Sequence, residues 1–231
     1  MIWHDVECGS YAADLPLWRE LAAAEGGPVL DVGAGTGRVT TDLAGRGVDV
    51  HALDVDAELL DALRRRAPAV PVHVADARDF ALPLRFPLVI APMQTVQLLG
   101  GPRGREAFLR CARRHLRPGG LLAAALANTI EDFDEGQVEV APDMREVDGV
   151  VYASRPTAVR ADGDGFVLER LRERVGPAGE RTVEENRIRL DRVTVERLNA
   201  EAAALGFRPE PARAIAETAD HVASEVALLR G

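Results

Sequence analysis

Three glycines and three aspartates are the residues of this sequence whose types and spacing best suit chemistry. The glycines lie in the stretch VLDVGAGTGRVT, residues 29–40, between an apolar run and a segment with helical periodicity. Asp31 precedes them, Asp54 ends the next apolar run, and Asp76 ends the one after it. Glycine lets the backbone approach a ligand closely, and carboxylates accept hydrogen bonds from hydroxyl and amino groups. The pattern predicts a site for a polar small molecule.

The first half of the chain contains the elements that must position these residues. Short aliphatic runs alternate with helical patterns, which is typical of βαβ units around a parallel sheet. We expect strands at 29–32, 48–53, 72–75, 88–92 and 121–126, and helices at 15–24, 36–44, 57–66 and 105–116. Asp56 is the expected helix N-cap, Gly47 an expected helix stop, and RPGG at 117–120 an expected turn. Because parallel strands end at one edge, the glycine loop, Asp54 and Asp76 converge there.

The second half changes character from about Ile130, where acidic and turn residues dominate. Alternating apolar and polar residues predict a three-stranded antiparallel meander at 150–159, 165–175 and 182–193, with turns at ADGDG and GPAGE. Thr194 caps a predicted helix that runs to Leu205, and a strand pair at 208–217 and 221–229 follows. We interpret residues 1–231 as a single domain in which 130–193 are an antiparallel insertion.

Composition excludes several classes of function. The 231 residues carry a formal charge of −9, and all 28 basic residues are arginine, so a P-loop lysine and a Schiff-base lysine are absent. A nucleic-acid partner is not expected, because such binding needs a concentrated cationic face. Two cysteines are too few for a disulfide framework, and no apolar run of membrane-spanning length occurs. We expect no membrane association and a cytoplasmic location.

Each of these signals also has an ordinary structural reading. A Gly-x-Gly loop can be a tight turn, and Asp54 and Asp76 can be caps or turn residues. The glycine loop, Asp54 and Asp76 nevertheless follow three successive predicted strands, and this arrangement favours a ligand-binding site. The glycines follow Gly-x-Gly-x-Gly with Arg38 next, whereas a dinucleotide site prefers Gly-x-Gly-x-x-Gly. Asp31 adds negative charge beside the loop, which favours a cationic adenosyl ligand over a diphosphate.

Several motifs together resemble the class I S-adenosylmethionine-dependent methyltransferases: VLDVGAGTGRVT, HALDVD, VHVADARDF, FPLVIAPM and LRPGG. The resemblance covers about residues 20–126. It implies a Rossmann-like α/β fold, a doubly wound seven-stranded sheet, mainly parallel, whose final strand is antiparallel. It also implies S-adenosylmethionine as cofactor and S-adenosylhomocysteine as product. One departure is Pro87, where relatives often have an aspartate, and this leaves the geometry of that loop open.

The resemblance also implies a role for each matching residue. Gly33, Ala34 and Gly35 lie against the methionine part, and Asp31 assists near its amino group. Asp54 holds the ribose hydroxyls, Val55 packs beside the adenine, and Asp76 and Ala77 contact the adenine edge. Pro92 and Met93 are expected to complete the methionine pocket. Tyr11 is expected either to cover the cofactor as a lid aromatic or to be a core residue.

The acceptor is less defined than the cofactor. The meander resembles the acceptor-covering or dimer-forming insertion of small-molecule N-methyltransferases, including those that act on amino sugars and glycine-like amines. We therefore expect a small-molecule acceptor, N-methylation in preference to O-methylation, and a monomer or homodimer. Gln94 and Gln97 are candidates for acceptor binding, or else begin a solvent-facing helix.

No catalytic residue is assigned from the sequence. Among the histidines, His73 and His115 are expected to be structural, while His4 and His221 stay unranked as bases. No spacing of His, Asp or Glu suits a metal, so metal-assisted transfer is not expected. Two other functions stay open: an NAD-dependent oxidoreductase that uses the same loop, and a cofactor-binding protein without transferase activity.

Overall fold

The computed structural model describes residues 1–127, 131–137, 140–218 and 221–231. They fall into two compact units, each described here by itself. The meander unit contains Met1–Tyr11 and Ile130–Arg192, and the seven-stranded unit contains Ala12–Thr129 and Val193–Gly231. The meander unit thus combines most of the predicted insertion with the first eleven residues of the chain.

The seven-stranded unit confirms the predicted sheet. Its strand order is β10-β11-β5-β4-β1-β2-β3, and only β11 runs antiparallel to its neighbours, pairing with β5 and β10. The strands are β1 (Val29–Val32), β2 (Val50–Asp54), β3 (Val72–Val74), β4 (Phe86–Ala91), β5 (Leu116–Leu126), β10 (Arg208–Ile215) and β11 (Ser224–Arg230). Because β1 to β4 are parallel, their carboxyl ends meet at one edge.

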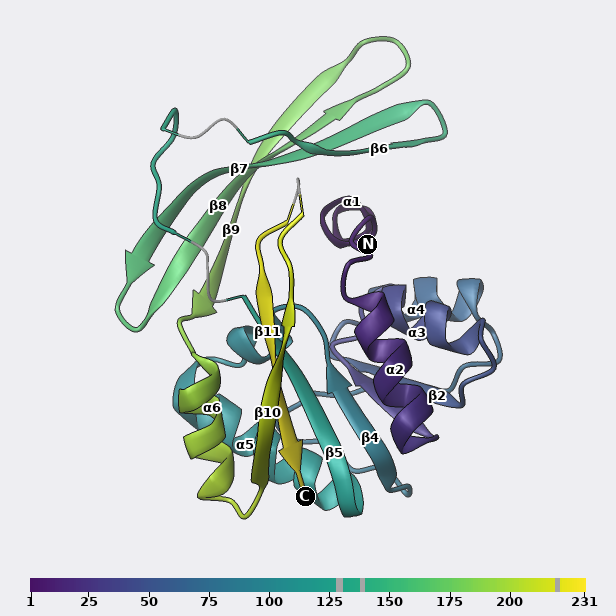
Figure 1. The fold of residues 1–231 in the computed structure, drawn as a ribbon. Helices are drawn as coiled ribbons and strands as arrows, with labels where there is room; N and C mark the ends of the chain where they lie inside the picture. The colour runs from purple at the N-terminus through teal and green to yellow at the C-terminus, as the bar shows by residue number, and fades with distance from the viewer. Residues whose placement is uncertain (128–130, 138–139, 219–220) are drawn as a thin grey trace. The chain divides into compact units, whose positions relative to one another are not determined.

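Helices cover the two faces of this sheet (Figure 1). They are α2 (Leu15–Glu25), α3 (Arg38–Ala44), α4 (Ala57–Arg66), α5 (Gly101–His115) and α6 (Val195–Ala203), with a 3-10 helix η1 (Thr95–Leu98) after β4. Phe86, Phe108 and Leu198 belong to one buried cluster between the sheet and the α5 and α6 side. Within β1, Asp31 alternates with Leu30 and Val32, so its side chain lies on the opposite face, toward α3.

Most predicted bounds differ from the observed ones by a few residues, and the larger differences concern α5, β5 and the segment after β4. α5 begins at Gly101 rather than at 105, because glycine and proline in its first turn hide its helical pattern. The residues RPGG do not form a separate turn but the irregular start of β5. A Cβ on Gly120 would lie 3.0 Å from the carbonyl oxygen of Pro87, so glycine permits this close strand contact. The short helix η1 was not predicted.

The meander unit contains α1 (Ile2–Cys8) and one antiparallel sheet in the order β6-β7-β8-β9. The sheet has four strands rather than the predicted three: β6 (Asp143–Val147), β7 (Val150–Asp162), β8 (Gly165–Val175) and β9 (Arg181–Asp191). The short β6 is exposed and largely polar, so it shows no apolar alternation. Glu7 of α1 accepts hydrogen bonds from Ser154 and Arg172, which ties the helix to β7 and β8.

Candidate functional site

Asp31 is a buried carboxylate that is only partly satisfied by the protein. Its side chain is 1% exposed, and its Oδ2 accepts a hydrogen bond of 2.6 Å from the hydroxyl of Thr40. Its Oδ1 is buried and has no hydrogen-bond partner among the described residues. Burial raises the pKa of Asp31 to about 6, although the Thr40 hydrogen bond and the Arg38 charge act against this rise. Such an atom is suited to receive a cationic N–H donor.

The glycine loop lies directly beside this carboxylate and is held to β2 by its own backbone. Gly33 and Ala34 donate their N–H groups to the Leu53 carbonyl, at 2.8 and 3.1 Å, and Gly35 donates to Asp54 Oδ2 at 2.8 Å. These donors therefore fix the loop instead of facing outward. Gly33 has φ +73°, and a Cβ there would lie 2.5 Å from the Thr95 hydroxyl, so only glycine fits.

Asp54 ends β2 with a carboxylate that is oriented by two backbone groups. Oδ2 accepts from Gly35, and Oδ1 accepts from the N–H of Asp56 at 2.9 Å. Each carboxylate oxygen has a second lone pair, so Asp54 retains acceptor capacity for hydroxyl groups. Asp56 caps α4 as predicted, through Glu58 and Leu59. Val55 between them is 70% exposed, which makes it an apolar surface beside the loop.

Asp76 stands at the third strand end, where its carboxylate is already paired. The Arg78 guanidinium donates to both of its oxygens, at 2.6 to 3.1 Å, and the Arg78 backbone N–H adds a 2.8 Å bond. The side-chain bond and then the backbone bond hold the pKa of Asp76 below its usual range. Ala77, between the two, is partly buried. A ligand amino group at Asp76 must share the carboxylate with Arg78.

The segment after β4 supplies Met93, Gln94 and Gln97. Met93 adopts φ +55°, a left-handed conformation that turns the chain sharply before η1. Gln94 stands at the N-cap position of η1 and is partly exposed. Gln97 is 1% exposed, and its side chain both accepts from the Ala127 N–H at 2.8 Å and donates to the Ala127 carbonyl. Gln97 therefore joins η1 to the end of β5 and does not begin a solvent-facing helix.

Arg38 has a structural partner that its place in the sequence does not reveal. Its guanidinium donates two hydrogen bonds, of 2.6 and 2.7 Å, to the buried carboxylate of Asp14, which also accepts from Trp18. This pair links α3 to the segment that precedes α2 and places a positive charge near Asp31. Thr40, Thr95 and Asp14 were not predicted, because no periodic pattern connects residues that meet through the tertiary fold.

The histidines considered as bases have structural contacts. His115 is buried, with Nδ1 2.8 Å from the Cys111 carbonyl and Nε2 accepting from the Leu82 N–H. His73 stacks on His51, and burial lowers its pKa. His221 lies between β10 and β11 in the sequence, while His4 belongs to the meander unit. None of these four lies in β1, in β2 or in the loops that follow β1 to β4.

Tyr11 belongs to the meander unit, so its lid role stays a prediction. Among the described residues, no group of three or more His, Cys, Asp or Glu side chains is arranged to hold a metal ion. Within the same residues, the helices are too short or too polar to cross a membrane.

Known proteins resemble this chain in sequence and in fold. A family model described as a methyltransferase domain matches residues 29–120. A dTDP-3-amino-3,6-dideoxy-alpha-D-glucopyranose N,N-dimethyltransferase of Streptomyces fradiae is 32% identical over 127 residues, 55% of this chain and 50% of its own length. A dTDP-3-amino-3,4,6-trideoxy-alpha-D-glucopyranose N,N-dimethyltransferase of Streptomyces venezuelae is 29% identical, over 63% of this chain and 60% of its own. The matches thus span half or somewhat more of these relatives.

A solved structure supports the fold across the whole chain. The amino pentose methyltransferase of Micromonospora echinaspora, solved with S-adenosylmethionine bound, aligns with a TM-score of 0.77 at 23% identity, covering 100% of this chain and 97% of its own. At this identity the likeness establishes the fold alone. The matched segment contains the glycine loop, Asp54, Asp76 and the turn at Met93. Residues 29–120 therefore match a methyltransferase domain in sequence, and the chain as a whole has the fold of a solved S-adenosylmethionine-bound methyltransferase.

Proposed function

We propose that this protein is an S-adenosylmethionine-dependent methyltransferase that methylates an amine on a small molecule. The observation that carries the proposal is the buried Asp31 carboxylate, whose Oδ1 lacks a partner among the described residues beside a loop that only glycine can form. A buried carboxylate is costly unless a cation joins it, and S-adenosylmethionine carries an ammonium group. The matched family and the names of the relatives agree with this assignment.

Each candidate residue at the carboxyl ends of the strands would contact a different part of this cofactor. Asp31 would receive the ammonium group, Gly33, Ala34 and Gly35 would lie against the methionine chain, and Met93 would close that pocket. The remaining adenosyl contacts would come from Asp54 with the ribose hydroxyls, Val55 beside the adenine ring, and Asp76 and Ala77 at its edge. Tyr11 would complete the set as a lid.

When bound, the cofactor supplies a methyl group on a positively charged sulfur, which a nucleophile displaces in line. The protein's part is to align the acceptor and to exclude water, and alignment alone is worth about 7 to 11 kcal/mol in well-oriented reactions.

Histidine is absent from the loops that follow β1 to β4, which are residues 33–37, 55–56, 75–85 and 92–94. A neutral amine attacks without a dedicated base, whereas a hydroxyl benefits from one, so the loop composition supports N-methylation. Gln94, partly exposed beside Met93, is our candidate for an acceptor contact.

Amino sugars are the first acceptor class to test, because the relatives named above act on them. The protein should release S-adenosylhomocysteine with amino-sugar nucleotides, and mass spectrometry should place the new methyl group on nitrogen. Activity should survive EDTA, since no metal is required. Methylation confined to the hydroxyls of matched sugars without the amine would contradict the proposal.

Cofactor preference separates the proposal from an NAD-dependent oxidoreductase. A ligand at 100 times its dissociation constant stabilises the folded state by about 2.7 kcal/mol. S-adenosylhomocysteine should therefore raise the melting temperature, and NAD should not. The reverse result would favour the oxidoreductase. Stabilisation by S-adenosylhomocysteine with no transfer to any amine, hydroxyl or thiol would favour a protein that binds the cofactor only.

For the meander unit we propose a role in acceptor covering or in dimer formation. Met144 on β6 and Val183 on β9 are large apolar side chains that are 62% and 53% exposed, on the two outer strands of its sheet. A dimer contact predicts that Val183→Glu lowers the mass measured by sedimentation equilibrium. If the variant and the parent chain are both monomers, acceptor covering is favoured, and the acceptor KM should respond to changes in this unit.

A further inference from the structure

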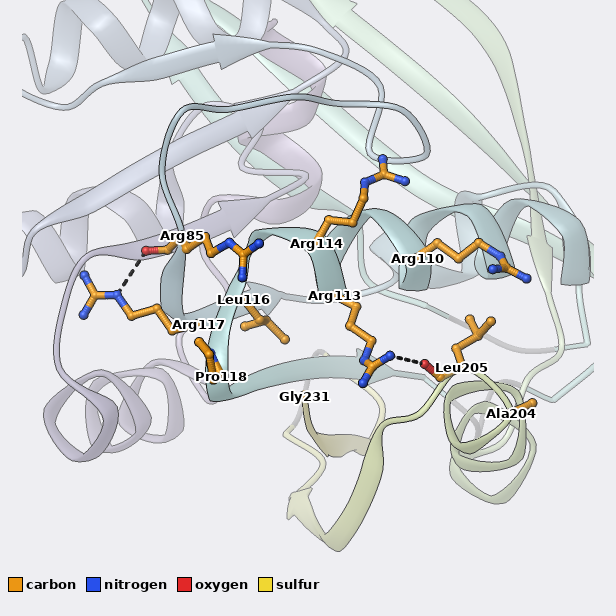
Figure 2. Close-up of a pocket in the computed structure, with 10 residues that line it drawn as sticks. All are labelled: Arg85, Arg110, Arg113, Arg114, Leu116, Arg117, Pro118, Ala204, Leu205 and Gly231. Atoms are coloured by element: carbon orange, nitrogen blue, oxygen red, sulfur yellow. Dashed lines mark hydrogen bonds between the residues drawn. The ribbon is translucent and has the colours of Figure 1, made fainter.

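The edge of the seven-stranded sheet opposite the glycine loop holds a cavity lined by five arginines. The cavity has a volume of about 620 Å³, and its arginines are Arg85, Arg110, Arg113, Arg114 and Arg117 (Figure 2). Arg85 immediately precedes β4, Arg117 follows the first residue of β5, and the other three come from the second half of α5. These are the amino ends of the strands whose carboxyl ends face Met93 and the candidate cofactor site.

Four of these arginines lack acidic partners. Within the described residues, Arg110 pairs with Glu106, whereas Arg85, Arg113, Arg114 and Arg117 form no ion pair with a carboxylate. Arg113 donates to the Leu205 carbonyl at 2.8 Å, Arg114 to the Cys111 sulfur at 3.3 Å, and Arg117 to the Arg85 carbonyl at 3.2 Å. A guanidinium has five N–H donors, so each keeps several for a ligand.

This arrangement is unusual for a chain whose charge is −9. Elsewhere in the same unit, arginines such as Arg38, Arg105 and Arg230 are paired with carboxylates at 2.6 to 2.9 Å. Cations in the last turn of a helix interact favourably with its dipole, which accounts for Arg113 and Arg114. It does not account for Arg85 and Arg117, which lie outside the helix. Several positive charges that line one cavity attract an anion.

The rest of the lining is largely apolar. Leu116, Pro118, Ala204 and Leu205 contribute hydrocarbon surface among the guanidinium groups, and Gly231 contributes backbone atoms. Arginine binds phosphate through paired N–H groups, and cavities of roughly 300 to 1,000 Å³ hold small organic ligands. A bare inorganic ion would leave the apolar part of the lining unused, and a small carboxylate would leave most of the cationic charge unmatched.

We propose that this cavity is a binding site for a small organic phosphate, separate from the cofactor and acceptor sites. The guanidinium groups of Arg85, Arg114 and Arg117 are exposed and point in different directions (Figure 2), so these side chains would turn toward the phosphate on binding, and the organic part would lie on Leu116 and Leu205. Neither the family match nor the relatives' names assign a ligand to this end of the sheet.

Phenyl phosphate is a suitable probe, because it contains a phosphate and an apolar ring but no nucleoside that could enter the cofactor site. Isothermal titration of the full chain should show saturable binding that weakens as salt is added. Inorganic phosphate should bind more weakly, and phenol should show no binding. The double variant Arg114→Gln with Arg117→Gln should weaken phenyl phosphate binding at least about tenfold, since charge-assisted hydrogen bonds are lost.

The matched control is Arg103→Gln, because Arg103 is an exposed arginine at the other end of α5, without a carboxylate partner in the described structure. It should keep the parent affinity. Circular dichroism should confirm that all variants are folded, and S-adenosylhomocysteine affinity should be unchanged in each. Unsaturable binding, equal loss in the control, or an unaltered affinity in the double variant would overturn the proposal. Cosedimentation with phosphatidylserine vesicles that depends on Arg114 and Arg117, without phenyl phosphate binding, would instead identify a membrane headgroup site.

Discussion

The two edges of the seven-stranded sheet carry opposite charges that the protein itself leaves uncompensated. At the carboxyl ends of the strands, Asp31 is buried with one oxygen unpartnered among the described residues. At the amino ends, Arg85 and Arg117 face a cavity without carboxylate partners in the same described part of the chain. The two differ in burial, because Asp31 is 1% exposed while the arginines lie at the surface.

This difference in burial predicts different energetic consequences. A buried charge without a partner lowers the free energy of unfolding. A ligand that neutralises this charge removes the penalty, and its binding free energy is more favourable by the same amount. Exposed charges are screened by water, so their repulsion costs little and their ligand affinity depends on salt. Variants of the buried Asp31 should therefore change both stability and affinity, whereas variants at the arginine cavity should change affinity alone.

The largest expected effect comes from Asp31→Asn. Removing one charge of a buried ion pair costs about 3 to 5 kcal/mol, so S-adenosylhomocysteine should bind at least about 100-fold more weakly. Titration calorimetry at pH 8 would measure the change. Asp42→Asn is the control, because Asp42 pairs with Arg19 on the outside of α3 and should leave the affinity as it is. Equal affinity of Asp31→Asn and the parent chain would remove Asp31 from the cofactor site.

The same substitution should have the opposite effect on the stability of the ligand-free protein. Burial raises the pKa of Asp31 from 3.8 to about 6, so the folded state holds a proton that the unfolded state has lost between these values. Stability from this group is therefore present below about pH 4 and is lost as pH rises through 6, by about 3 kcal/mol in all. Urea unfolding at pH 8 should show Asp31→Asn to be more stable than the parent, with the advantage vanishing near pH 4. A parent chain that matches the variant at both pH values would show that Asp31 is not strained by burial.

Asp54→Ala should have a smaller effect on affinity. Its carboxylate is less buried than that of Asp31 and would contribute hydrogen bonds to ribose hydroxyls, so we expect a loss of roughly 1.5 to 3 kcal/mol in S-adenosylhomocysteine binding. Asp56→Ala removes the α4 N-cap two residues away, which costs about 1 kcal/mol of stability and should spare affinity. Affinity lost equally in both variants would mean that the effect spreads through α4 and not through ribose contacts.

Sequence periodicity was sufficient to predict most strands of the seven-stranded sheet, because each buried parallel strand is a short aliphatic run between turn residues. The bounds of β1 and α4 were predicted correctly, as were the place of Asp31 within β1 and the places of Asp54 and Asp76 near the ends of β2 and β3. Where glycine or charge obscures the pattern, prediction failed: Gly101 and Pro102 begin α5, and the polar β6 has no alternation.

The partners of the site residues were beyond reach of the sequence. Arg38 follows the glycine loop, but its carboxylate partner Asp14 lies 24 positions earlier, and Thr40 reaches Asp31 only because α3 packs on β1. The arginine cavity combines segments near residues 85, 113 and 117 with the end of α6. Such contacts depend on tertiary packing, which local patterns do not encode.

The smallest expected effect concerns Asp76, a candidate cofactor residue that already has an arginine partner. Arg78 is exposed, so its ion pair is screened by water and adds little to stability. If the adenine amino group must share the carboxylate with this guanidinium, Arg78→Gln should tighten S-adenosylhomocysteine binding by about threefold or less, with unfolding unchanged. Arg64→Gln breaks a similarly exposed pair with Asp61 on α4 and should leave binding as it is. Weaker binding in Arg78→Gln would instead show that Arg78 positions Asp76 for the cofactor, so that this edge, like the opposite one, would use an arginine for recognition.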